Sequence, residues 1–210
     1  MHYRVLLGLL LCLPGVLWAS QCSLLIVGDS LSSGYGLAAN EGWVDRLGMR
    51  LKKAAPAWQA VNSSVSGDTT QNGVQRLPAA LQRQRPQGVL IELGGNDALR
   101  GTPPAEIRRN LETMIRQAKQ AGAWVLLFEP PVLPNYGKAY GEAVARLYRE
   151  VAREQRVTLV PCFVCGVGVD PALMQADGIH PNGRAQAKML DAVWPHLKPK
   201  LRCGEAASKP

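Results

Sequence analysis

Short apolar runs alternate along the chain with longer stretches in which apolar residues recur at helical spacing. A short uninterrupted apolar run is typical of a strand buried on both faces, whereas a spacing of three or four predicts an amphipathic helix. Five runs predict strands, at residues 24–27, 60–61, 89–93, 124–128 and 157–160. Helical spacing covers residues 43–51, 74–81, 102–121, 140–151 and 183–194.

The ends of two predicted helices carry recognisable signals. Thr102 can cap a helix, Pro103 suits its first turn and Gly122 stops it. The last helix is expected to open at Asn182 or Gly183. Pro195 should end or kink that helix, because proline lacks the amide hydrogen that a helix interior needs.

This order of elements predicts a doubly wound α/β fold. Strands that are apolar throughout and alternate with helices form parallel βαβ units, in which helices cover both faces of the sheet. A chain of 210 residues suits one domain of this kind, which we place at residues 20–197. Residues 198–210 are rich in Lys, Pro and Gly and are predicted to form a flexible C-terminal tail.

The N-terminal segment, residues 1–19, is typical of a secretory signal peptide. His2 and Arg4 precede an apolar run over residues 5–16, and the small residue Ala19 closes the segment. The run is too short for a transmembrane anchor, which needs about 20 apolar residues. We expect cleavage near Ala19, which lowers the net charge from +8 to +7, and export to the periplasm.

Four cysteines remain after that cleavage, namely Cys22, Cys162, Cys165 and Cys203. An even number in an oxidising compartment predicts disulfides, but the sequence does not choose among the three pairings. Cys162 and Cys165 have the spacing of a redox or zinc motif. A zinc site needs two further ligands, and the Gly-rich surroundings do not resemble the helix start of a redox motif. A structural disulfide or two packed thiols is the better interpretation.

Composition and charge exclude several classes of protein. With 47% hydrophobic residues and no periodic glycine, the chain is neither disordered nor collagen-like. The net charge of +8 and an isoelectric point near 9.5 fit nucleic acid, an anionic membrane surface or an acidic ligand equally. The basic residues fall on helix faces without a recognition motif, so we expect no nucleic-acid partner and only transient contact with anionic membranes.

Residues that can carry chemistry follow the predicted strands. Ligands of parallel α/β sheets bind where loops leave the carboxyl ends of the strands. The loops in question are residues 28–36, 63–70, 94–102, 129–138 and 162–182. The first places Ser30 directly after a strand, in Gly28-Asp29-Ser30. A serine hydroxyl is a poor nucleophile and needs a base that a third group orients.

His180 is the candidate for that base. The mature chain has one other histidine, His196, which lies in a Lys-rich terminal segment typical of solvent-exposed surface. Asp177 precedes His180 by three residues, with Gly178 between them. Its carboxylate can therefore fold back on the imidazole Nδ1–H and leave Nε2 free for Ser30.

Hydrolysis of an acyl group also needs donors aimed at the developing oxyanion. Gly67, in the second loop, can present a backbone N–H without a side chain in the way. Two glycines before Asn96 let its amide turn inward from the third loop. Each motif alone is an ordinary turn, whereas the whole series occurs in one order at successive strand ends.

These four blocks resemble the SGNH (GDSL) hydrolase family, which is named for Ser, Gly, Asn and His in this order. Within it, the chain is similar to the bacterial periplasmic esterases that include acyl-CoA thioesterase I, lysophospholipase L1 and arylesterases. The resemblance covers about residues 22–197. It rests on five segments, which are residues 28–36 (GDSLSSGYG), 66–70 (SGDTT), 92–101 (ELGGNDALRG), 134–137 (PNYG) and 177–182 (DGIHPN).

The resemblance implies a five-stranded, flavodoxin-like sheet and a serine hydrolase site. Ser30 would be the nucleophile, His180 the general base and Asp177 the residue that orients it. The backbone amides of Ser30 and Gly67 and the side chain of Asn96 would form the oxyanion hole. The resemblance implies no metal and no organic cofactor.

The chain departs from this subgroup in two segments. Cys162 and Cys165 stand where apolar or acidic residues are expected, so a disulfide here would be particular to this branch. Residues 129–134 differ from the subgroup in a loop that resembles the lining of the acyl-chain groove. Residues 98–103 resemble a mobile loop that closes on acyl chains.

We therefore expect a monomeric serine hydrolase of acyl esters and thioesters, of the arylesterase, acyl-CoA thioesterase or lysophospholipase type. Apolar residues that favour longer acyl groups near the site are Leu99, Val132, Leu133 and Tyr136. A carbohydrate O-acetyl esterase is the alternative within the same chemistry, and it predicts a small pocket with a polar rim. A non-catalytic exported binding protein is a third hypothesis, but it gives no reason for a histidine and an acid opposite the serine.

Overall fold

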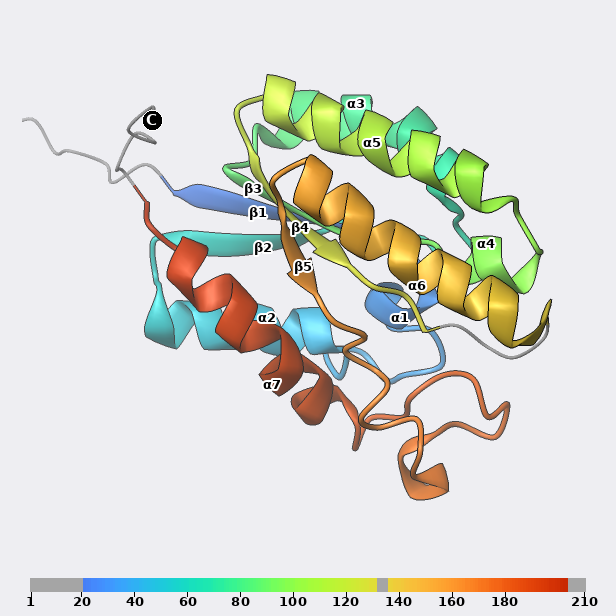
Figure 1. Cartoon of the computed structure of the whole chain (residues 1–210). Helices are drawn as coiled ribbons and strands as arrows, with labels where there is room; N and C mark the ends of the chain where they lie inside the picture. Colours follow the sequence, from blue (N-terminus) through green and yellow to red (C-terminus); the bar gives the residue numbers. More distant parts are fainter. Residues whose placement is uncertain (1–20, 132–135, 204–210) are drawn as a thin grey trace, which may run out of the picture.

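Five parallel strands form one sheet in the order β2-β1-β3-β4-β5, which confirms the predicted α/β class (Figure 1). The computed structural model describes residues 21–131 and 136–203. The strands are β1 (Cys22–Gly28), β2 (Trp58–Asn62), β3 (Gly88–Glu92), β4 (Trp124–Phe128) and β5 (Thr158–Val160).

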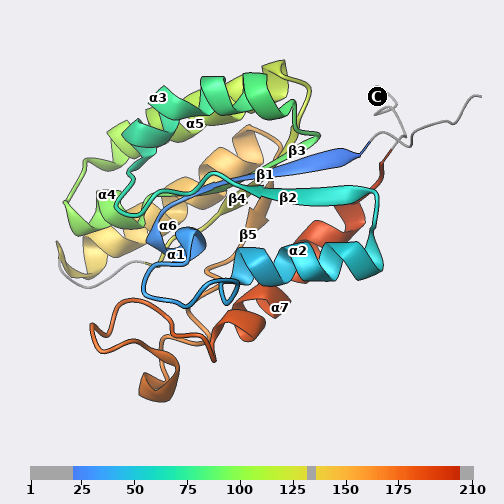
Figure 2. The same ribbon diagram turned by 180° about the vertical axis from the view of Figure 1, so that it is seen from behind.

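Helices cover both faces of this sheet, as the two opposite views show (Figure 1, Figure 2). One face carries α2 (Trp43–Ala54) and α7 (Gln186–Leu197). The other carries α3 (Thr70–Gln84), α5 (Pro104–Gln120) and α6 (Gly137–Glu154). The short elements are α1 (Ser30–Ser33), α4 (Gly95–Leu99) and the 3₁₀ turns η2 (Pro171–Leu173) and η3 (Lys198–Lys200).

The continuous apolar run of β1 follows from its central position. Successive side chains of a strand point to opposite faces. Leu24 and Ile26 pack with α2 and α7, while Leu25 and Val27 pack with α3 and α5. All four are completely buried, so a polar residue at any of them would face a packed core.

The starts of two predicted helices differ from the structure. Pro103, rather than Thr102, is the N-cap of α5, and the helix begins one residue later, at Pro104. α7 begins at Gln186 and not at Asn182 or Gly183, because the carbonyl oxygen of the Asn182 side chain accepts a hydrogen bond from the Arg184 amide (3.0 Å) and residues 183–185 form a turn. 

Pro195 was expected to end or kink the last helix, but α7 continues through it to Leu197. Val193 and Leu197 on either side of the proline are fully buried in the core beside β1. Their burial holds the last turn in place despite the missing hydrogen bond of the proline.

Residues 198–210 were predicted to form a flexible tail, and the structure differs from this prediction over residues 198–203. Lys198–Lys200 forms a 3₁₀ turn, and Cys203 is disulfide-bonded to Cys22 at the start of β1. The covalent link to the central strand ties this segment down. Residues 204–210 lie outside the described residues.

Among the described residues, no helix has the length and apolar character needed to cross a bilayer. The predicted signal peptide, residues 1–19, lies outside the part of the chain that the structure describes.

Candidate active site

The loops after β1 and β3 lie side by side at the position in the sheet where the strand order changes direction. In the strand order found here, β1 and β3 are neighbours, β2 lies on one side of them, and β4 and β5 lie on the other. A crevice forms at such a point, outside the carboxyl ends of the strands. Ser30 follows β1 and Asn96 follows β3, so both predicted site residues border this crevice.

Ser30 is held by a tight turn at the end of β1. It is the first residue of α1, and the Asp29 side chain caps this helix by accepting a hydrogen bond from the Leu31 amide (3.0 Å). Gly34 ends α1 with a left-handed backbone (φ +82°), a conformation that glycine adopts without steric cost. The turn leaves the Ser30 hydroxyl facing the loop that follows β5.

That loop brings His180 and Asp177 to Ser30 from 150 residues further along the chain. His180 Nε2 lies 2.9 Å from Ser30 Oγ, and His180 Nδ1 lies 2.7 Å from Asp177 Oδ2. A carboxylate beside Nδ1 selects the tautomer whose hydrogen is on Nδ1, which leaves Nε2 as an acceptor for the serine proton.

The Asp177 carboxylate is organised by the backbone of its own loop. Its Oδ1 accepts hydrogen bonds from the amides of Ile179 (2.9 Å) and His180 (3.0 Å). The His180 backbone amide, followed by the His180 side chain and the Ile179 amide, lowers the pKa of Asp177 to about 2. The His180 ring is also fixed by Tyr35, whose ring centroid lies 4.7 Å away. Asp177 is therefore ionised, and the imidazole is oriented, over the whole physiological pH range.

Three groups that can donate hydrogen bonds belong to residues that line the pocket around Ser30. The backbone amides of Ser30 and Gly67 have no hydrogen-bond acceptor among the described residues. Gly67 adopts a left-handed backbone (φ +83°), which aims its peptide into the crevice. Asn96 Nδ2 donates to Asp29 Oδ2 (3.1 Å) and to the carbonyl oxygen of Asp68 (3.0 Å). These groups can stabilise a negative oxygen that forms beside Ser30.

A pair of buried carboxylates, which the sequence analysis did not single out, underlies this arrangement. Glu92 is fully buried at the end of β3, where its Oε2 accepts hydrogen bonds from Ser32 Oγ (2.6 Å) and from the Asp29 amide (3.4 Å). Burial raises the pKa of Glu92 well above its usual range, and burial raises the pKa of Asp29 to about 6. The signal in the sequence was an acidic residue at the end of an otherwise apolar strand.

Two further hydrogen-bond networks hold the loops after β2 and β3, and the sequence analysis did not predict them. Asp97 accepts hydrogen bonds from the amide (2.8 Å) and hydroxyl (2.6 Å) of Thr70, and Asn110 donates to that hydroxyl (3.0 Å). Arg76 pairs with Asp68 and donates to the Gly28 carbonyl (3.1 Å). The second loop, which carries Gly67, is thereby tied to α3 and to the end of β1.

The crevice opens into a pocket of about 530 Å³. It contains Ser30, Gly67, Asn96 and His180, so all four blocks of the predicted site share one cavity. Most of its other lining is apolar or backbone, including Leu31, Leu99, Val164, Val169, Met174 and Ile179. A volume of this size accommodates a chain of several carbons beside the serine.

The four residues predicted to favour longer acyl groups have different outcomes. Leu99 lines the pocket. Tyr136 does not, because its ring packs against Tyr140 (centroids 5.5 Å apart) and beside Gly101. Val132 and Leu133 lie outside the described residues.

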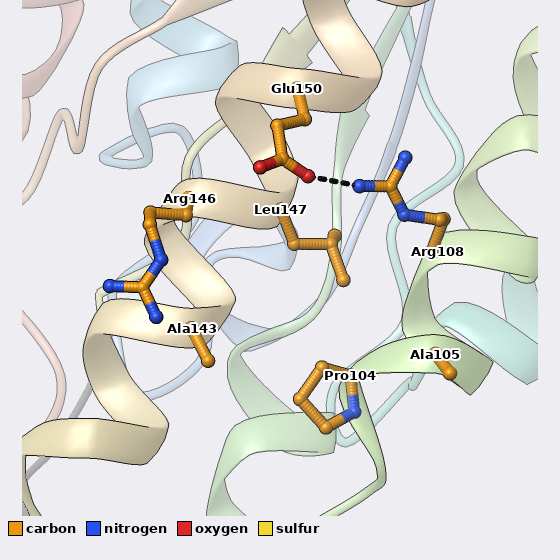
Figure 3. Close-up of a pocket in the computed structure, with 7 residues that line it drawn as sticks. All are labelled: Pro104, Ala105, Arg108, Ala143, Arg146, Leu147 and Glu150. Atoms are coloured by element: carbon orange, nitrogen blue, oxygen red, sulfur yellow. Dashed lines mark hydrogen bonds and ion pairs between the residues drawn. The ribbon is translucent and has the colours of Figure 1, made fainter.

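A second pocket, of about 310 Å³, lies between α5 and α6 (Figure 3). Figure 3 shows Arg108 turned toward Glu150 across this pocket, and Arg108 also pairs with Glu154 (2.9 Å). Arg146, which also lines the pocket, pairs with Glu142 outside it, and the pocket contains no residue of the predicted site. Within residues 21–131 and 136–203, no group of three or more His, Cys, Asp or Glu is placed to hold a metal ion.

The chain is similar to known proteins over most of its length. The profile of the GDSL-like Lipase/Acylhydrolase family matches residues 26–188. Esterase TesA of Pseudomonas aeruginosa is 48% identical over 193 residues, which cover 90% of this chain and 96% of that protein. Thioesterase 1/protease 1/lysophospholipase L1 of Escherichia coli K12 is 42% identical over 185 residues, 86% of each chain. A crystal structure of TesA matches with a TM-score of 0.82 and 48% identity, over 85% of this chain and 99% of that one.

Proposed function

Because the chain belongs to the GDSL-like lipase/acylhydrolase family and is therefore a carboxylic ester and thioester hydrolase, we propose that Ser30 is its nucleophile. The observation that carries this proposal is the hydrogen-bonded series from Asp177 through His180 to Ser30, with distances of 2.7 and 2.9 Å. A serine, a histidine and an acid in this order are what acyl transfer without a cofactor requires.

In the first half-reaction, Ser30 Oγ attacks the acyl carbon while His180 Nε2 takes the hydroxyl proton. Asp177 stabilises the imidazolium that forms. His180 then returns the proton to the departing alcohol or thiol, and the acyl group stays on Ser30 as an ester. In the second half-reaction, His180 takes a proton from water, the resulting hydroxide attacks the acyl ester, and the carboxylic acid leaves as Ser30 regains its proton.

The oxyanion of each tetrahedral intermediate is stabilised by Ser30, Gly67 and Asn96. The two backbone amides have no acceptor among the described residues and are free to donate. One hydrogen of the Asn96 side-chain amide stays bonded to Asp29 (3.1 Å). The other leaves the Asp68 carbonyl oxygen (3.0 Å) and is donated to the oxyanion. Donors held in place before the reaction need no reorganisation when the charge develops.

The pocket supports substrates with an acyl chain longer than acetyl. Its lining is mainly apolar, and three large apolar side chains at its mouth are exposed: Tyr35 (51%), Ile179 (45%) and Val169 (83%). A carbohydrate O-acetyl esterase calls for a polar rim instead. Relatives are named as an esterase and as a thioesterase and lysophospholipase, and fatty-acyl esters, thioesters and lysophospholipids fit this pocket.

The cellular setting is part of the proposal. Export to the periplasm is supported by the two disulfides, Cys22–Cys203 and Cys162–Cys165, which persist in oxidising compartments. Transient contact with anionic membranes is supported by the net charge of +8 and the apolar mouth of the pocket. The monomeric state stays a prediction. N-terminal sequencing of the periplasmic protein and activity on lysophospholipid micelles at two ionic strengths test the first two statements.

The central experiment compares wild type with Ser30→Ala on p-nitrophenyl esters from acetate to palmitate and on palmitoyl-CoA. We expect Ser30→Ala to lower kcat by at least about a thousandfold on every substrate. We expect wild-type kcat/KM to rise from acetate toward medium or long chains. Activity on acetate alone would favour the O-acetyl esterase, and hydrolysis that persists in Ser30→Ala would refute the assignment of the nucleophile.

A further inference from the structure

A turn of the chain between β5 and η2, residues 162–169, forms one side of the pocket. Four of its residues line the cavity that also contains Ser30, namely Val164, Cys165, Gly168 and Val169. Leu99 lines the same cavity from α4, in the loop after β3. An acyl chain attached at Ser30 therefore has the 162–169 turn as one of its walls.

This wall has little secondary structure of its own. Within it, backbone hydrogen bonds join residues three or four apart, such as the Gly168 amide to the Val164 carbonyl (2.9 Å). Gly166 and Gly168 reduce its stiffness further, because glycine has the largest backbone freedom of all residues. Packing holds the inner side, since Phe163 and Val167 are buried in the core.

The Cys162–Cys165 disulfide joins the inner side of the turn to the side that faces the pocket. Cys162 packs against the core that α2 and α7 share, whereas Cys165 is exposed and lines the cavity. The bond closes a loop in which the two Cα atoms are 5.4 Å apart. It thus fixes Val164 and Cys165 relative to a rigid part of the molecule, and the hydrogen bond from the Gly168 amide to the Val164 carbonyl links the next part of the wall to them.

We propose that the turn of residues 162–169, whose first four residues are closed into a loop by the Cys162–Cys165 disulfide, positions the acyl chain and sets the chain-length preference of this enzyme. The inference rests on the proposed function, since it concerns the acyl group bound at Ser30. A long acyl chain gains binding free energy by burying methylene groups against the wall, and a wall held in place before binding loses little entropy when the chain binds. An acetyl group stays at Ser30 and does not need this wall.

The test measures kcat and KM of wild type and Cys162→Ser/Cys165→Ser with p-nitrophenyl acetate and p-nitrophenyl decanoate. We expect the ratio of the two kcat/KM values, decanoate over acetate, to fall about tenfold in the variant, the loss expected when about two methylene groups are no longer buried. The fall should come from a higher KM for decanoate. An equal loss on both esters would overturn the proposal, because a general loss of structure lowers both alike.

Three further variants serve as controls for this test. Cys22→Ser/Cys203→Ser removes the other disulfide, which lies at the opposite end of β1, and should leave the ratio unchanged below its own unfolding temperature. Val169→Ser changes a wall residue that is 83% exposed, so folding does not depend on it, and should lower the ratio even if the double variant does not fold. Val169→Leu should keep the ratio high.

The outcomes separate this inference from the proposed function. If hydrolysis depends on Ser30 but the ratio stays at the wild-type value in both Cys162→Ser/Cys165→Ser and Val169→Ser, the turn does not set the preference and only this inference fails. If Ser30→Ala remains active, the proposed function fails, whatever the ratios are.

Discussion

At the scale of single residues, Asp29 shows how much of the site depends on a side chain that does not react. Its Oδ1 caps α1 behind Ser30, and its Oδ2 accepts a hydrogen bond from Asn96. Both Ser30, the proposed nucleophile, and Asn96, a proposed oxyanion donor, are therefore positioned by one buried carboxylate. Next to it lies Glu92, also buried, so the site contains two acidic groups in a dry environment.

Burial of Asp29 leads to a pH-dependent stability. Its pKa is raised to about 6 in the folded protein from an ordinary value of 3.8, with desolvation as the largest cause. The folded state then binds this proton more tightly than the unfolded state, so the contribution of Asp29 to stability falls as the pH rises from about 4 through about 6. His180, Asp68 and Glu92 face this carboxyl and act on it in opposite directions.

We expect Asp29→Asn to remove this pH dependence, because the amide does not ionise. The free energy of unfolding, measured in urea at pH 4.5 and pH 7.5, should decrease more in wild type than in the variant over this interval. The variant should also lose activity, since its amide group would face the amide of Asn96 where a carboxylate oxygen now accepts. A difference between the two proteins that is equal at both pH values would contradict the assignment of the titration to Asp29.

At the scale of elements, α6 supports the site without contributing a residue to it. Tyr148 of α6 is fully buried, and its hydroxyl donates to the carbonyl oxygen of Leu93 (2.6 Å), just after β3. The following residue, Gly94, has φ +117°, a conformation that disfavours any side chain, and leads directly into Asn96. Packing of α6 on the sheet thus sets the direction in which the third loop leaves β3.

Gly94→Ala should therefore damage both stability and catalysis. A Cβ at this position would lie 1.9 Å from the Tyr148 hydroxyl, in addition to the strain of the positive φ. We expect a loss of more than about 2 kcal/mol in unfolding free energy and a fall in kcat, because the turn that holds Asn96 must move. Urea unfolding and steady-state kinetics measure the two effects.

Gly122→Ala is the matched control for that prediction. Gly122 also has a positive φ (+81°), at the end of α5, but a Cβ there meets no atom within 4 Å. It should cost about 1–2 kcal/mol from backbone strain and leave kcat unchanged. If Gly94→Ala behaved no worse than this control, the contact with Tyr148 would not matter.

At the scale of the whole molecule, a disulfide joins the two ends of the domain. Cys22 at the start of β1 and Cys203 after η3 are 181 residues apart in sequence, so the bond closes almost the entire described chain into one loop. The Cys162–Cys165 bond, with a separation of 3, closes a very small one. The first restricts the unfolded chain far more than the second.

Cys22→Ser/Cys203→Ser should therefore lower stability more than Cys162→Ser/Cys165→Ser does. Loop-closure entropy sets upper values of about 5 and about 2 kcal/mol for the two bonds. Urea unfolding of both double variants at one pH tests this order, and the acyl-ester ratios of the same proteins should change in the reverse order. Equal losses of stability in the two variants would show that chain entropy is not the main effect.

The local pattern of the sequence was sufficient for much of the architecture. The runs around Leu25, Ile91 and Leu127 are strands, because a segment that is apolar at every position can only be buried on both faces. The motifs around Ser30, Gly67, Asn96 and His180 marked the loops that meet in one pocket, since those loops leave the carboxyl ends of strands in one parallel sheet. The spacing of apolar residues and the chemistry of a motif are local properties of the chain. They can therefore be read from the sequence without knowledge of the fold.

Only the tertiary structure decided which distant residues meet. The buried contact of Glu92 with Asp29, the pairing of Cys22 with Cys203, and the pocket wall formed by residues 162–169 depend on how loops far apart in sequence are packed. The position of Tyr136 beside Gly101, away from the pocket, was decided in the same way. Such contacts follow from the burial of whole elements against one another, a long-range effect that no local run of residues encodes.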